Sequence, residues 1–185
     1  MKHIEELLEY NKGFVEREEY KNYQSAKYPN KKIAILTCMD TRLVQLLPAS
    51  MGIKNGDVII IKNAGGLVSH PFGSIMRSIM VAIYQLGVQE LMVVAHDDCG
   101  MYRLDTEGFV DTMKERGISP ETVSMISYCG VDIEKWLSGF HNTEESVTET
   151  INSIKNHPLV PKDIVIGGFI MHPVTGELRK VEIDK

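Results

Sequence analysis

Apolar residues follow two patterns along the chain, continuous runs and helical spacing. The continuous runs have the length of β-strands and cover residues 33–37, 58–61, 91–95 and 164–170. A run without alternating polar residues predicts a strand that is buried on both faces, as in a parallel sheet. The predicted sheet therefore consists mostly of parallel strands.

Helical spacing occurs between these runs. Apolar residues recur at intervals of three and four over residues 72–86, and Gly87 provides a stop signal. A further helix is predicted over residues 143–156, with Asn142 or Thr143 as its cap. The alternation of strands and helices predicts an α/β fold with a mostly parallel central sheet and helices on both of its faces.

The N-terminal segment has a different character from the rest of the chain. Residues 3–23 are charged and polar, with a few apolar positions at helical spacing. We expect a helical arm over residues 1–30 and a single α/β domain over residues 31–185. A chain of 185 residues is long enough to bury close to 70% of its unfolded surface without disulfides or metal.

Charge and composition narrow the possible partners. The chain has 20 Lys and Arg against 25 Asp and Glu, a net charge of -5, and no basic cluster. This argues against nucleic acid or an anionic membrane and favours a small neutral substrate. No apolar stretch approaches the roughly 20 residues that span a bilayer, and the N-terminus does not read as a signal peptide. Three cysteines make a poor disulfide framework. We therefore expect a cytoplasmic protein.

Reactive side chains directly follow the first and third predicted strands. Cys38 and His96 each come one residue after a strand, and Cys99 follows His96 by three positions. The carboxyl ends of parallel strands meet at one edge of a sheet, so these residues converge if their strands lie close together. Two thiolates and an imidazole suit zinc and leave a fourth coordination position for chemistry. Taken singly, each residue is more often a core cysteine or a loop histidine, but their combination favours a metal site.

Cys38, Asp40 and Arg42 are spaced two residues apart, so in an extended segment their three side chains can point to one side. An ion-paired Asp40 would stay ionised and accept a proton from water. Arg42 would keep the carboxylate from the vacant coordination position. The alternative is a surface ion pair at the start of a helix over residues 43–47. The position beside a metal ligand favours a catalytic pair.

The remaining candidates carry weaker signals. Residues 62–66, Lys-Asn-Ala-Gly-Gly, match neither a P-loop nor a dinucleotide fingerprint, and we interpret them as a turn that lines the pocket. Cys129 has no companion and is interpreted as a structural thiol. The scattered histidines, including His157 and His172, are interpreted as solvated or hydrogen-bonded.

These motifs resemble those of the β-class carbonic anhydrases. Cys-x-Asp-x-Arg follows the first strand, Asn-Ala-Gly the second and His-x-x-Cys-Gly the third, and the resemblance extends over residues 31–182. The continuation Cys99-Gly100-Met101 is most similar to the compact prokaryotic branch. The resemblance implies that Cys38, His96 and Cys99 are zinc ligands. It also implies that Asp40 and Arg42 form a pair that controls access to the metal.

The activity implied by the resemblance is the zinc-dependent, reversible hydration of carbon dioxide to bicarbonate and a proton. The resemblance also implies a homodimer or a larger homo-oligomer, because the family builds its active-site cleft at a subunit interface. Two alternatives stay open at this point. One is a zinc hydrolase of carbon disulfide or carbonyl sulfide on the same fold, and the other is a catalytically inactive zinc or thiol sensor.

Overall fold

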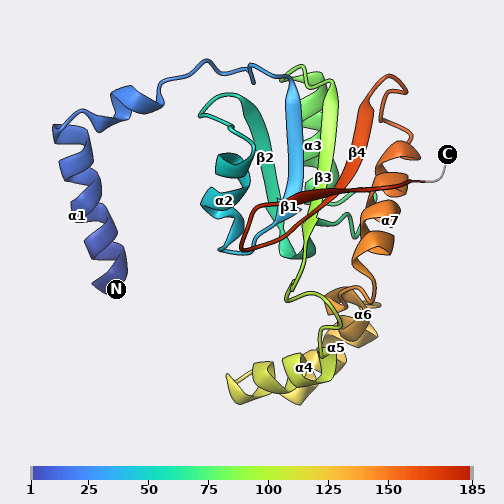
Figure 1. The fold of residues 1–185 in the computed structure, drawn as a ribbon. Helices are drawn as coiled ribbons and strands as arrows, with labels where there is room; N and C mark the ends of the chain where they lie inside the picture. The colour runs from blue at the N-terminus through green and yellow to red at the C-terminus, as the bar shows by residue number, and fades with distance from the viewer. Residues whose placement is uncertain (1, 184–185) are drawn as a thin grey trace.

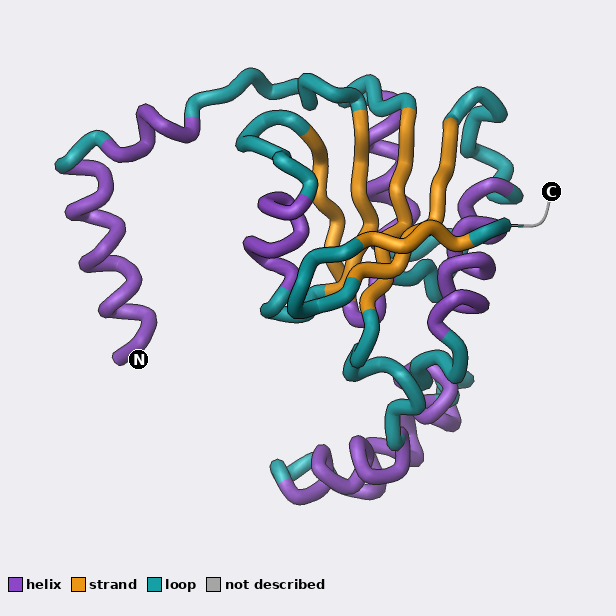
Figure 2. Tube along the Cα trace, viewed as in Figure 1, coloured by secondary structure: helices purple, strands orange, loops and turns teal. Residues whose placement is uncertain are grey.

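A computed structural model describes residues 2–183 and has a five-stranded sheet at its centre (Figure 1). The strands are β1 (Ile33–Cys38), β2 (Val58–Asn63), β3 (Glu90–His96), β4 (Val165–Met171) and β5 (Leu178–Val181). Their order across the sheet is β2-β1-β3-β4-β5, and β5 alone among them is antiparallel to its neighbour (Figure 2). The predicted α/β fold with a mostly parallel sheet is confirmed.

Helices cover both faces of this sheet, as predicted. The helices are α1 (Lys2–Glu16), α2 (Leu43–Ser50), α3 (Ser74–Tyr84), α4 (Thr106–Glu115), α5 (Pro120–Tyr128), α6 (Ile133–Leu137) and α7 (Thr143–Lys155). Successive side chains of β1 point to opposite faces. Ala34 and Leu36 join the core under α3 and α7, whereas Ile35 packs with α2.

Both predicted helices are present, with ends that differ from the prediction by up to two residues. Asn142 is the N-cap of α7, and its Oδ1 accepts hydrogen bonds from the backbone N–H groups of Glu144 at 2.9 Å and Glu145 at 3.2 Å. The helix predicted over residues 72–86 is α3, and Gly87 follows it with a φ of 69°. A glycine adopts this left-handed conformation at little cost.

One burial prediction is wrong. The apolar run 58–61 predicts a strand buried on both faces, but β2 lies at the edge of the sheet and Ile60 is 38% exposed. The helix on that face, α2, is only eight residues long, and its buried Leu43 and Leu47 pack with Ile35 of β1. The cover over β2 is therefore incomplete. An apolar run alone does not distinguish a central strand from an edge strand.

The sequence analysis predicts no elements between the third strand and α7, where the structure has α4, α5 and α6. These helices gather beyond the carboxyl edge of the sheet (Figure 1). The two ends of this lobe are joined by hydrogen bonds from the N–H of Arg103 to the Phe140 carbonyl, 2.8 Å, and from the N–H of Phe140 to the Met101 carbonyl, 3.1 Å. A Cβ at Gly139 would lie 1.7 Å from the Met101 oxygen, so only glycine allows this approach.

The N-terminal segment lies apart from the sheet (Figure 1). It forms α1 and then a short 3-10 helix over Glu19–Tyr23. None of the described residues of α1 is buried, and Ile4, Leu7 and Leu8 are more than half exposed. Within residues 2–183, no helix combines the length and the apolar character needed to cross a membrane.

Candidate metal centre

The register of the sheet brings the first and third strands side by side. β1 and β3 are neighbours, with Ile33 opposite Glu90 and Thr37 opposite Val94. The hydroxyl of Thr37 donates a buried hydrogen bond of 2.7 Å to the Val94 carbonyl and joins the two strands just before they end. Cys38 and His96, the last residues of these strands, therefore lie at adjacent points on one edge of the sheet.

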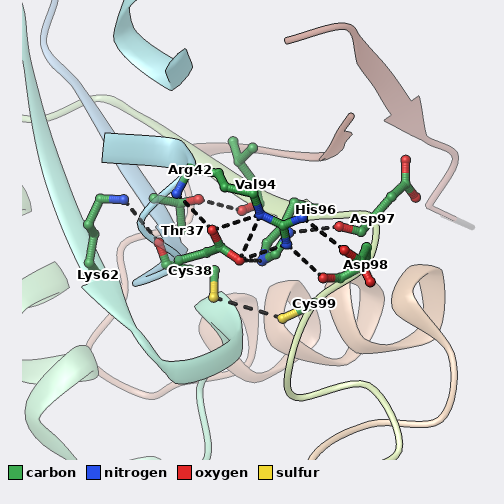
Figure 3. A network of polar contacts seen from close by, with 10 residues as sticks. Thr37, Cys38, Arg42, Lys62, Val94, His96, Asp97, Asp98 and Cys99 are labelled. Atoms are coloured by element: carbon green, nitrogen blue, oxygen red, sulfur yellow. Dashed lines mark hydrogen bonds and ion pairs between the residues drawn. The ribbon is translucent and has the colours of Figure 1, made fainter. Parts of the chain in front are cut away.

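The structure brings Cys38, His96 and Cys99 together, as the sequence predicts. Each offers one ligand atom, and these atoms lie within 4.8 Å of one another. The two sulfur atoms are 3.8 Å apart and face each other (Figure 3). All three residues are buried, with exposures of 4%, 1% and 7% in the order given. Two sulfurs and an imidazole nitrogen at these separations can bind one metal ion from three sides.

The ring of His96 is held with one nitrogen free for a ligand. Nδ1 lies 2.8 Å from the carbonyl oxygen of Asp97, which can only accept, so Nδ1 carries the proton and donates. Nε2 is buried and has no hydrogen-bond partner among the described residues. A buried polar atom without a partner is costly. A metal ion bound between this nitrogen and the two sulfurs would remove that cost.

The environment of Cys38 favours a thiolate. Its pKa is lowered to about 4, chiefly by the hydrogen bond with Cys99 and further by His96 and the backbone N–H groups of Asp40 and Gly65, while burial opposes the shift. The pKa of Cys99 is raised, because its proton is shared with Cys38 and because the site is buried. The Cys38–Cys99 pair therefore gives up one proton readily, which prepares the site for a cation.

The turn after β2 presses against the backbone of Cys38, in agreement with the interpretation of residues 62–66 as a turn that lines the site. Asn63 closes the turn, because its Nδ2 donates to the Leu67 carbonyl at 2.8 Å and its Oδ1 accepts from the Leu67 N–H at 3.1 Å. Gly66 has a φ of 65°, and a Cβ there would lie 2.8 Å from the Cys38 nitrogen. Glycine is therefore required for steric and conformational reasons.

We expect Gly66→Ala to lower the free energy of unfolding by about 3 kcal/mol, since it adds a clash to a left-handed backbone. Gly87→Ala is the matched control. Gly87 has a φ of 69°, but no described atom lies within 4 Å of its ideal Cβ, so we expect a loss of only about 1 kcal/mol. Urea denaturation of the two variants measures the difference. Equal losses would show that the contact with Cys38 has no energetic weight.

Asp40 and Arg42 form a close ion pair beside the sulfur and nitrogen atoms. Arg42 donates to the carboxylate from Nη2 at 2.8 Å, from Nε at 3.1 Å and from its backbone N–H at 2.8 Å. The hydrogen bonds from Arg42 lower the pKa of Asp40 to about 2, against some opposition from burial. The carboxylate oxygen Oδ2 lies 3.8 Å from Nε2 of His96. An ionised carboxylate therefore lies next to the candidate metal position.

Arg42 also contacts a residue to which the sequence analysis assigns no role. Its Nη1 donates to Oδ2 of Asp98 and its Nη2 to the Asp98 carbonyl, both at 2.8 Å (Figure 3). The guanidinium thus joins the loop after β1 to the loop after β3. The position of Asp98 between His96 and Cys99 is a signal in the sequence that could have identified it.

The weaker candidates have ordinary structural roles. His157 is buried, and its Nδ1 accepts from the Leu159 N–H at 3.2 Å. Its Nε2 has no hydrogen-bond partner among the described residues, but His157 does not belong to the group of residues that could hold a metal ion. His172 accepts from two backbone N–H groups of the turn that follows β4. The interpretation of Cys129 as a structural thiol is wrong, because this residue is exposed. It follows α5, none of whose described residues is buried.

Comparison with known proteins gives the family. A family model described as "Carbonic anhydrase" matches residues 33–180, which include the whole candidate site. The crystal structure of β-carbonic anhydrase isoform I from Trichomonas vaginalis superposes with a TM-score of 0.90, at 32% identity and 100% coverage of both chains. The chain belongs to the β-class carbonic anhydrases. Its similarities are to the compact bacterial type.

Other members of this family differ in their described activity. The Bacillus subtilis protein named "Putative carbonic anhydrase YvdA" is 50% identical over 175 residues, 95% of this chain and 89% of the relative. A carbon disulfide hydrolase of an Acidianus species is 32% identical over 163 residues, 82% of this chain and 78% of the relative.

Tetrameric β-carbonic anhydrases of Sordaria macrospora share the fold, with a TM-score of 0.61, 16% identity and 98% coverage of both chains.

Proposed function

We propose that this chain is a zinc enzyme that catalyses the reversible hydration of carbon dioxide to bicarbonate and a proton. Cys38, His96 and Cys99 are the proposed zinc ligands. The observation that carries the proposal is the unpartnered, buried Nε2 of His96, which lies within 4.8 Å of two sulfur atoms and beside an ionised carboxylate. Sulfur and imidazole donors suit zinc, and three protein ligands leave one position for a small molecule.

When bound, zinc would lower the pKa of a coordinated water molecule toward neutrality, and this is the chemistry it would supply. The protein orients that water through Asp40. With a pKa of about 2, Asp40 is a weak base at neutral pH, so it accepts a hydrogen bond rather than storing a proton. Arg42 holds the carboxylate through two side-chain nitrogens and its backbone N–H and restrains it from the metal.

An apolar surface beside the sulfur atoms suits an uncharged substrate. Leu67, Met101 and Phe140 pack against Cys38 and Cys99. Leu67 and Phe140 also line a cavity of about 660 Å³, whose remaining lining along α6 and α7 is mostly polar, so the apolar contacts lie at its Leu67 and Phe140 side. Carbon dioxide has no charge and offers few groups to bind, so contact with apolar side chains is the interaction open to it. We propose that the substrate reaches the metal along this surface.

Carbon disulfide or carbonyl sulfide is a second candidate substrate, favoured by the 32% identity to a carbon disulfide hydrolase. The test uses the zinc-loaded full chain. Stopped-flow measurement with a pH indicator follows the hydration of carbon dioxide, and sulfide release follows the hydrolysis of the two sulfur analogues. We expect hydration to be much the faster reaction. Faster sulfide release would favour the second substrate class, and zinc binding without either reaction would favour a sensor.

We also propose that the chain forms a homodimer or a larger homo-oligomer, with residues 1–30 as an arm and residues 31–185 as the α/β domain. The exposed apolar side chains of α1, among them Leu7 and Leu8, support this proposal, as do the tetramers described for Sordaria macrospora. Size-exclusion chromatography with light scattering should give at least twice the mass of one chain. The double substitution Leu7→Glu/Leu8→Glu should lower that mass, whereas Lys12→Glu on the same exposed helix should not. A monomeric wild type at micromolar concentration would contradict the proposal.

The cytoplasm is the proposed location. Cys38, Cys99 and Cys129 are all free in the structure, and the two proposed ligand thiols must stay reduced to bind zinc. Cell fractionation with an antibody to the chain tests this placement.

A further inference from the structure

Arg179, which the sequence analysis does not identify, joins three parts of the fold near the metal centre. It belongs to β5 and lies opposite Ile170 of β4. Its Nη2 donates to Oδ1 of Asp97 at 3.1 Å, and its Nη1 donates to Oε1 of Glu144 at 2.6 Å. Asp97 directly follows His96, and Glu144 is in the first turn of α7. One guanidinium therefore connects an edge strand, a helix N-terminus and the turn that follows a proposed zinc ligand.

The backbone N–H, the side chain and the carbonyl of Asp97 each make a hydrogen bond, and the bond to the carbonyl sets which nitrogen of His96 carries the proton. The backbone N–H of Asp97 donates to the Met171 carbonyl at 3.0 Å, which extends the pairing of β3 with β4 by one residue. Its side chain accepts from Arg179, and its carbonyl accepts from Nδ1 of His96 at 2.8 Å. The bond to this carbonyl (Figure 3) keeps the proton on Nδ1 and leaves Nε2 without a hydrogen-bond partner and available to a metal.

We propose that Arg179 is a positioning residue for the metal centre: by holding the side chain of Asp97, it fixes the peptide whose carbonyl orients the His96 ring. The next residue, Asp98, has a φ of 54°, so the chain turns sharply directly after this peptide. The pairing of β3 with β4 ends at the Asp97 N–H, and beyond it side chains hold the peptide, Arg179 through Asp97 and Arg42 through Asp98. Glu144 in turn holds Arg179 in place from the N-terminus of α7.

The simpler interpretation is an ordinary surface ion pair. The side chains of Arg179 and Asp97 are 48% and 42% exposed, and a pair of this kind contributes little to stability. The two interpretations predict different effects. A surface pair affects only unfolding, whereas a contact that orients a metal-binding histidine affects metal affinity, by about 10- to 100-fold in other sites.

The test measures metal binding rather than catalysis. Arg179→Gln is prepared in the full chain, and its zinc dissociation constant is determined by competition with a chromophoric chelator. The visible spectrum of the Co²⁺-substituted protein reports the ligand geometry. We expect zinc to bind about tenfold more weakly and the Co²⁺ bands to change. Arg179→Lys should fall in between, because an ammonium contacts one acid but cannot bridge two in the manner of a guanidinium.

Further variants separate positioning from a general loss of structure. Lys114→Gln is the matched control, because it breaks an exposed ion pair with Asp111 on α4, 2.8 Å long, and should leave zinc affinity unchanged. Glu144→Gln keeps Arg179 and should weaken zinc binding by less than Arg179→Gln. If Arg179 acts through Asp97, then Arg179→Gln/Asp97→Ala should bind zinc no more weakly than Asp97→Ala alone.

The inference rests on the proposed zinc site, but its failure is distinct from failure of the proposed function. If zinc affinity and the Co²⁺ spectrum are unchanged in Arg179→Gln, the positioning role is overturned and the hydration proposal stands. The same conclusion follows if the losses of zinc affinity in Arg179→Gln and Asp97→Ala add in the double variant. A wild type that binds zinc without hydrating carbon dioxide would contradict the function alone. A wild type that binds no zinc would overturn both.

Discussion

Cys38→Ser should lose its bound zinc and lower kcat/KM for carbon dioxide hydration by on the order of 10³-fold or more. A serine hydroxyl does not ionise at neutral pH, whereas the pKa of Cys38 is lowered to about 4 by Cys99, His96 and two backbone N–H groups. The substitution therefore removes one of the two thiolate donors in the proposed ligand set. Zinc per chain is measured by mass spectrometry of the purified protein, and hydration by stopped flow.

The matched control is Cys129→Ser, which makes the same chemical change at an exposed thiol. It should keep one zinc per chain and full activity. Circular dichroism of both variants tests the fold, and we expect it to be retained, because the main clusters of buried apolar side chains do not include Cys38. Full zinc occupancy and activity in Cys38→Ser would contradict the proposed ligand set.

The convergence of Cys38 and His96 could be predicted from the sequence because it depends on the backbone. Both residues follow apolar runs, and parallel strands deliver such residues to one edge of a sheet. The remaining condition, that β1 and β3 are neighbours, is met by the register that pairs Thr37 with Val94. Cys99 needs only the short turn after His96. The local pattern thus contains almost all the information that places these three residues.

The contacts around them could not be predicted in this way. Arg42 reaches Asp98 across 56 positions and Arg179 reaches Asp97 across 82. Such contacts depend on the direction of long side chains from exposed loops and an edge strand, and these leave no periodic signal in the sequence. The lobe formed by α4, α5 and α6 is not predicted by the sequence for a related reason. Its helices are short, and α5 has no buried position among its described residues to produce an apolar pattern.

Asp40→Asn should retain zinc and lower kcat for hydration by about 10²-fold. The Asp40 carboxylate is outside the group of three proposed ligand atoms, but its Oδ2 is 3.8 Å from Nε2 of His96. Asparagine keeps the size of the side chain and removes the charge that orients water. Asp111→Asn, which changes an exposed acid on α4, is the control and should have no effect.

The pH dependence follows from the low pKa of Asp40. A pKa of about 2, below the ordinary 3.8, means that the ion pair with Arg42 stabilises the fold above about pH 4 and that this contribution is lost as pH falls toward 2. Asp40 is therefore ionised throughout the neutral range. A rise in hydration rate with pH near neutrality should persist in Asp40→Asn with its midpoint little changed. If the rise in hydration rate with pH is absent from Asp40→Asn, the group that titrates near neutrality is Asp40 instead.

Arg42→Gln tests the restraint on Asp40 and should lower activity for a different reason from Asp40→Asn. Without the guanidinium, the carboxylate loses its side-chain donors, Nη2 and Nε, and is free to bind the metal as a fourth ligand. The Co²⁺-substituted variant should show a changed visible spectrum. In Asp40→Asn/Arg42→Gln there is no carboxylate to restrain, so the double variant should be no less active than Asp40→Asn. Losses that add would mean that Arg42 acts independently of Asp40, most directly through its contacts with Asp98.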